Sequence, residues 1–156
     1  MKRISLIAVV LILFNTTIFA NSFNVGDKIP TFSLTNQFDK KTTINKDIKY
    51  LIISFEKSTG KEINSYLSKK PASYLKKNSA VFIANISKMP IIITKMFALP
   101  KMRDYTHNIL LILDENDKRF VSKEGKSTLY TLDNLTIKSI EFITSKKLKR
   151  VFSENR

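Results

Sequence analysis

The amino-acid sequence predicts an α/β domain with a central mixed sheet, flanking helices and an N-terminal β-hairpin. Three short and almost continuous apolar runs, Tyr50–Phe55, Ala80–Ile86 and Ile109–Leu113, are typical of strands that are buried on both faces. Segments with helical spacing separate the runs, and strands joined by helices pair in parallel through right-handed crossovers. We therefore expect the three runs to be adjacent central strands of one sheet.

The segment before the first run has the pattern of a hairpin. Residues 25–30 have turn composition, and Thr31–Leu34 alternates strictly between polar and apolar residues, as a half-exposed strand does. Asp39–Lys41 would turn the chain, and Thr42–Ile44 would return as the partner strand.

A first helix is expected after the first apolar run. Thr59 and Glu62 have the spacing of a capping box, which would place the helix start at Thr59. The apolar stripe of this helix would consist of Ile63, Tyr66 and Leu67, and the helix would stop before Pro71.

A second helix is expected after the second run. Pro90 suits a first helical turn, and the helix would continue through Ile91–Phe97. Three consecutive isoleucines also suit a strand, so that alternative stays open here.

The last third of the chain predicts a hairpin and a terminal helix. Ser127–Leu132 and Thr136–Ile143 alternate around Asp133-Asn134, which reads as a hairpin turn. Thr144-Ser145 can cap a helix whose apolar residues are Leu148, Val151 and Phe152.

The N-terminus predicts export. Lys2 and Arg3 precede the apolar stretch Ile4–Phe14, and this order is typical of a secretory signal peptide over residues 1–20. Cleavage after Ala20 or after Ser22 is possible, and an uncleaved N-terminal anchor is the alternative. Since the sequence has no cysteine, a lipoprotein anchor is excluded. We expect a periplasmic or secreted protein with one domain, residues 21–156.

The charge is strongly basic. The chain has 27 basic and 13 acidic residues, a formal net charge of +14, which falls to +12 if Lys2 and Arg3 are removed with a signal peptide. Such a charge attracts anionic partners. The lysines are spread along the chain, however, and the abundance of Lys, Asn and Ile also fits the codon bias of a low-G+C genome. Both readings stay open, and no nucleic-acid partner is expected.

Residues 25–37, VGDKIPTFSLTNQ, resemble the opening of the thioredoxin-like superfamily, in the branch of peroxiredoxins and periplasmic thiol reductases. The predicted order of elements is similar over most of residues 21–156. The chain also resembles a poorly characterised group of bacterial periplasmic thioredoxin-like proteins. The resemblance implies a thioredoxin-like fold with a hairpin before the first central strand.

This sequence lacks the residues that the family's catalytic chemistry requires. Its thiols lie just after the first central strand, where this sequence has Glu56–Glu62 without a cysteine. A thiolate is the nucleophile of that chemistry, so thiol redox activity is excluded. The family's cis-proline would fall at Thr106–Asn108, which contains no proline. The resemblance thus implies a degenerate, non-catalytic member.

The former active-site corner is our candidate binding surface. Its candidate residues are Lys57, Ser58, Thr59, Lys61, His107 and Asn108. The leading hypothesis is that this corner binds a protein or peptide partner in the cell envelope.

Two alternatives stay open. One is a basic protein that binds an anionic envelope polymer or a membrane surface. The other is an enzyme of unrecognised type that uses Ser58, Lys61 or His107, since Ser58 and Lys61 have S-x-x-K spacing. That spacing occurs in penicillin-binding enzymes, but their KTG partner motif is missing from this sequence. With one histidine and no cysteine, a transition-metal site would have to rest on carboxylates. We expect neither a metal nor a cofactor.

Overall fold

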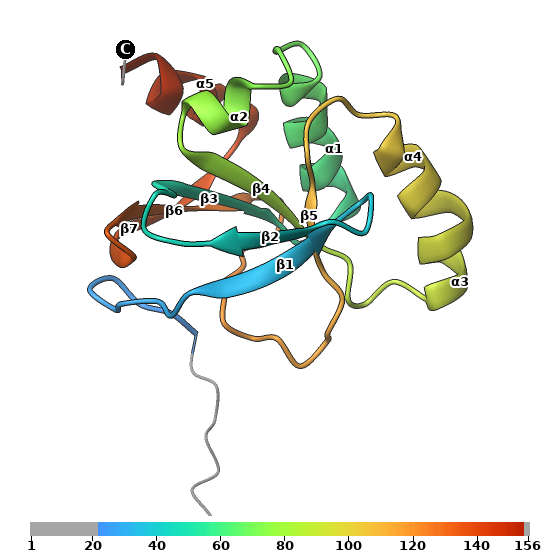
Figure 1. Cartoon of the computed structure of the whole chain (residues 1–156), viewed down its shortest axis with the longest axis horizontal. Coiled ribbons are helices and arrows are strands. Elements are labelled where there is room, and N and C mark those ends of the chain that lie inside the picture. Colours follow the sequence, from blue (N-terminus) through green and yellow to red (C-terminus); the bar gives the residue numbers. More distant parts are fainter. Residues whose placement is uncertain (1–21, 155–156) are drawn as a thin grey trace, which may run out of the picture.

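The computed structural model describes residues 22–154, so the predicted signal peptide over residues 1–20 lies outside the described residues. A seven-stranded mixed sheet forms the centre, in the order β2-β1-β5-β4-β3-β6-β7 (Figure 1). Its strands are β1 (Phe32–Asn36), β2 (Lys41–Ile44), β3 (Tyr50–Ser54), β4 (Ala80–Asn85), β5 (Leu110–Ile112), β6 (Ser127–Asp133) and β7 (Thr136–Ile143). The helical segments are α1 (Lys57–Leu67), α2 (Tyr74–Lys77), α3 (Ile91–Ile93), the π-helical turn η1 (Thr94–Ala98), α4 (Leu99–Arg103) and α5 (Ser145–Glu154).

The three apolar runs form the centre of the sheet, as the sequence predicts. Strands β3, β4 and β5 are adjacent and parallel, with Ile52 beside Phe82 and Ala84 beside Leu111. Helix α1 connects β3 to β4. The predicted α/β class is therefore confirmed.

Both hairpins are also confirmed. Strand β1 pairs antiparallel with β2 and, on its other side, with β5, while β6 pairs antiparallel with β3 and β7. The turn between β6 and β7 is centred one residue later than expected. Asn134 and Leu135 both have positive φ, 48° and 66°, as the two central residues of a type I′ turn require.

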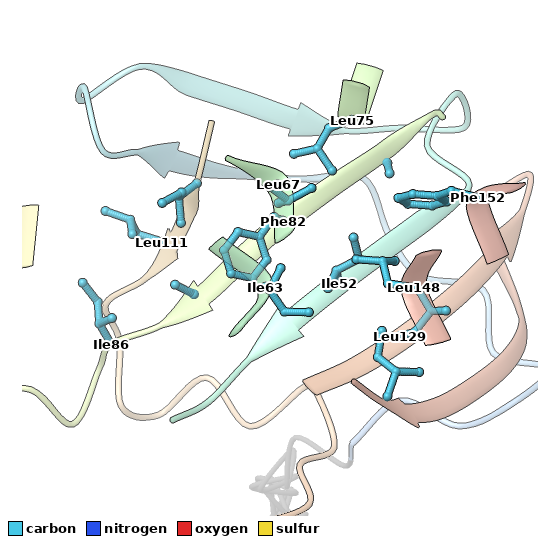
Figure 2. Packing of buried hydrophobic residues seen from close by; sticks show 14 residues of the cluster. Ile52, Ile63, Leu67, Leu75, Phe82, Ile86, Leu111, Leu129, Leu148 and Phe152 are labelled. Atoms are coloured by element: carbon cyan, nitrogen blue, oxygen red, sulfur yellow. The ribbon is translucent and has the colours of Figure 1, made fainter. Parts of the chain in front are cut away.

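The sheet is buried on both faces because side chains of the central strands alternate. Ile52 and Phe82 point to the face that α1 and α5 cover, where Ile63 and Leu148 pack against them (Figure 2). Leu51, Ile53, Ile83 and Tyr130 belong to a second cluster on the other face. The loop between β5 and β6 lies on the side of the sheet opposite the helices (Figure 1).

The capping box at Thr59 and Glu62 is wrong. Helix α1 begins two residues earlier, at Lys57, and the Thr59 hydroxyl is buried and donates to the backbone oxygen of Glu56 at 3.1 Å. The Glu62 carboxylate instead accepts from the backbone N–H and hydroxyl of Ser145, at 2.7 and 2.8 Å. It therefore caps α5, because an acceptor with negative charge at a helix N-terminus satisfies a free N–H and complements the helix dipole.

Replacing Glu62 with alanine should lower the free energy of unfolding by about 1–2 kcal/mol, because both hydrogen bonds to Ser145 and the charge at the α5 N-terminus are lost. Denaturant unfolding measures the change. The control is Glu115→Ala in the exposed loop after β5, which should stay within about 0.5 kcal/mol of the parent protein. Equal stability of the two variants would contradict the cap.

The second helix forms where the sequence predicts it, and the strand alternative is wrong. Segments α3, η1 and α4 follow one another without a break, and together we call them helix 91–103. The π-helical turn comes directly before Pro100, which lies in the first turn of α4. Proline lacks an N–H and its ring clashes with the carbonyl four residues earlier, so a widened turn relieves that clash.

Candidate functional site

The predicted corner residues do not share one surface. Lys57, Ser58 and Lys61 lie exposed in the first turns of α1, whereas Thr59 is buried beneath them. Asn108 is exposed before β5, where its side-chain oxygen accepts from Asn36 Nδ2 on β1 at 3.4 Å.

His107 is a core residue. It is 3% exposed, and its Nε2 lies 2.8 Å from Oδ1 of Asn64, a buried residue of α1. The rings of Tyr105 and Phe82 pack against it, with ring centroids at 5.3 and 6.4 Å. The segment around residue 107 therefore contacts α1 at Asn64. This contact lies about one helical turn beyond Lys61, the last of the predicted corner residues on α1.

Burial sets the protonation state of His107. The loss of hydration lowers its pKa from 6.5 to about 4, because a charged imidazolium is disfavoured away from water. With Asn64 Oδ1 assigned as the acceptor, Nε2 carries the proton. Nδ1 has no hydrogen-bond partner among residues 22–154. The ring is thus neutral at pH 7 and is held in place by Asn64.

Ser58 and Lys61 do not form an activated nucleophile in this arrangement. The Ser58 hydroxyl donates to the Glu56 carboxylate at 3.3 Å. Ser58 and Lys61 also line a shallow hollow of about 450 Å³ between α1 and α5, whose other residues include Glu62, Tyr66 and Ser145. No hydrogen bond joins Ser58 to Lys61 or His107 in the part of the chain that the structure describes, and serine requires such a base to act as a nucleophile.

A larger groove runs along the other side of α1. Its volume is about 560 Å³, and its walls are α1, the end of β4 and helix 91–103, so we call it the α1–α4 groove. These walls lie on the helical side of the sheet, where α4 stands beside α1 (Figure 1). The apolar lining consists mainly of Phe55, Ile86, Met89, Ile93, Phe97 and Met102.

Polar residues stand among and around this apolar lining. Four lysines contribute to it, namely Lys57, Lys61, Lys88 and Lys101. Asn64 and Tyr105 also line the groove, so the hydrogen bond and ring contact of His107 support two lining residues from behind. Of the six predicted site residues, Lys57 and Lys61 line the groove.

Sequence reasoning missed the wall formed by helix 91–103. Ile91, Ile92, Ile93, Met96 and Phe97 each leave between 43% and 65% of their surface exposed. A helix that is apolar on nearly every side must be covered on more than one of them. The sequence of Ile91–Phe97 contains this signal, because its apolar residues occupy more than one face of the helix. It could have predicted an additional apolar surface there.

Among residues 22–154, no group of three or more His, Cys, Asp or Glu side chains could hold a metal ion. In the same part of the chain, no helix is both long enough and apolar enough to cross a bilayer.

No family model and no curated protein matches the sequence. Solved structures do match. The thioredoxin domain of a thiol-disulfide oxidoreductase from Bacteroides vulgatus is similar with a TM-score of 0.55 and 15% identity, covering 85% of this chain and 98% of that one. The fold is thioredoxin-like.

Two further thioredoxin-like structures support the same fold. A peroxiredoxin-like protein from Aquifex aeolicus has a TM-score of 0.54 at 8% identity, with 86% of this chain and 88% of that chain covered. A thio-disulfide isomerase from Thermus thermophilus has a TM-score of 0.52 at 14% identity, with 85% and 96% covered. These neighbours are bacterial proteins named for thiol chemistry or for likeness to thiol enzymes, whereas this chain has no cysteine.

Proposed function

We propose that this chain is a non-catalytic thioredoxin-like domain of the cell envelope that binds a protein or peptide partner through the α1–α4 groove. The observation that carries the proposal is the groove itself. A mostly apolar hollow of about 560 Å³ with a few polar groups around it is the usual form of a binding site.

The position of the groove supports the proposal. Its residues 55–57 directly follow β3, the first central strand, which is where the resemblance implies the catalytic thiols of related domains. Without a thiol, that position keeps a concave surface and loses the redox step. The envelope location rests on the signal-peptide pattern of residues 1–20.

The test uses a photoreactive phenylalanine analogue and crosslinking in the producing cell. Placed at Phe97, which lines the groove, the analogue should give a discrete adduct with one partner. The matched control is Phe142, a second exposed phenylalanine, which lies on β7 and does not line the groove. An absence of adduct at Phe97, or equal adducts at both positions, would contradict the proposal.

Charge reversal provides a second test of the same site. Lys57→Glu with Lys61→Glu should abolish the Phe97 adduct and leave the free energy of unfolding within about 0.5 kcal/mol, because both lysines are exposed. If the adduct persists in that double variant, the alternative of a diffuse basic surface gains support.

A further inference from the structure

We propose that the groove accepts an acidic amphipathic segment of a partner protein, in which large apolar side chains are flanked by Asp or Glu. This inference rests on the proposed function and adds the chemistry of the segment. Three features of the groove point to such a segment, namely its apolar walls, the charge around it and its concave shape.

The walls call for large apolar side chains. Ile93 and Phe97 line the groove and are 43% and 62% exposed, so their apolar surface is uncovered in the free domain. Covering such surface removes it from water, which is favourable. Met89 and Met102 line it as well, and methionine adapts its shape to varied ligands because its side chain is unbranched and polarisable.

The charge around these walls calls for carboxylates. All four lining lysines are exposed, and none of them forms an ion pair within residues 22–154. The one acidic lining residue, Glu56, already accepts from the Ser58 hydroxyl and from the backbone N–H of Gly125. The surrounding sequence is also positively charged, because residues 63–103 include eight basic residues and no acidic one. Complementary charge speeds encounter and selects partners.

The shape favours a peptide segment over a bilayer. The apolar side chains of Ile93 and Phe97 line a hollow between two helices, and a flat lipid surface cannot follow such a hollow. A segment that presents apolar side chains along one face can place them between the two walls, in the manner of helix-in-groove recognition. Its carboxylates would then lie beside lysines on both sides of the groove.

The experiment identifies the segment and then measures its affinity. Mass spectrometry of the Phe97 adduct gives the partner sequence at the crosslink, and that segment is synthesised as a labelled peptide. Fluorescence anisotropy then measures the Kd for the purified protein. We expect at least two Asp or Glu residues beside the apolar residues of the segment. We also expect about tenfold weaker binding after Lys88→Gln with Lys101→Gln.

The control removes the same charge elsewhere. Lys118→Gln with Lys123→Gln lies in the loop after β5, outside the groove, and should change the Kd less than twofold. Equal weakening by both double variants would overturn the inference, since binding would then follow net charge alone. A Phe97 adduct whose segment lacks carboxylates would overturn it while leaving the proposed function intact. An absent adduct would remove both.

Vesicles test the competing surface. Flotation with vesicles that contain anionic phospholipid should leave the protein unbound at physiological salt. Flotation of the parent protein that is lost in Phe97→Ser would assign the groove to lipid and overturn the inference.

Discussion

Replacing Phe82 with alanine should lower the free energy of unfolding by about 3–5 kcal/mol, the range for a large aromatic core residue. Phe82 is 0% exposed on the central strand β4, where it packs beside Ile52 and Ile63 (Figure 2). The His107 ring also packs against it. Truncation leaves a cavity on the helical face of the sheet, and the rigid strands on both sides of β4 limit collapse into it. Urea denaturation measures the loss through the midpoint at constant slope.

The matched control for Phe82→Ala is Ile92→Ala. Ile92 is apolar but 64% exposed on helix 91–103, so its truncation should stay within about 0.5 kcal/mol of the parent protein. A loss below about 1 kcal/mol for Phe82→Ala would mean that β4 is not the centre of the core.

Acidification from pH 7 to pH 4 should cost about 3 kcal/mol of stability through His107 alone. Its pKa is lowered to about 4 by burial, against 6.5 for the free side chain. Between these values the unfolded chain binds a proton that the folded protein does not, so stability falls as pH falls. Each pH unit inside the window corresponds to about 1.4 kcal/mol.

Urea denaturation at several pH values between 7 and 4 tests this effect. His107 is the sole histidine of the sequence, and Asn64 can still be met by an amide in His107→Gln. The variant should show a slope against pH that is smaller by up to about 1.4 kcal/mol per unit in that window. Asp117 acts separately, because Arg119 lowers its pKa below 3.8 and its contribution is lost only at lower pH. Parallel pH profiles for the two proteins would refute a buried neutral His107.

The sheet could be predicted because its signals are local. Residues 50–55, 80–86 and 109–113 are almost continuously apolar, and short runs of that kind are typical of strands covered on both faces. The two hairpins could be predicted from the alternation of polar and apolar residues along their strands and from the turn residues between them. The order of the elements followed from the parallel pairing that helices between strands impose.

The start of α1 was mispredicted because the deciding contact is distant. Thr59 and Glu62 have the right spacing for a cap, but the partner of Glu62 is Ser145, 83 residues further along the chain. The spacing of four neighbouring residues cannot show that a distant residue, here Ser145, binds the Glu62 carboxylate instead. The same holds for His107, since its burial depends on Asn64, which is 43 residues away.

The candidate site was predicted in part. Lys57 and Lys61 do line the groove, because the loop after a central strand and the first turns of its helix lie at one end of the sheet. The opposite wall could not be placed, since sequence alone does not say which apolar residues of Ile91–Phe97 are left uncovered. Which of these residues stay exposed depends on how much of helix 91–103 packs against the sheet and α1.

The ends of the sheet have a consequence for self-association. Strands β2 and β7 are its two edges, and an open edge can recruit a strand from another molecule. Here the chain before β1 covers the beginning of β7: Gly26 N–H donates to the Ile137 oxygen, Ile137 N–H donates to the Asp27 oxygen, and Ile29 N–H donates to the Leu135 oxygen. The other edge, β2, is only four residues long and begins with a lysine, two features that discourage strand addition. The segment before β1 therefore occupies the first part of the β7 edge and shortens the stretch to which a strand of another molecule could add.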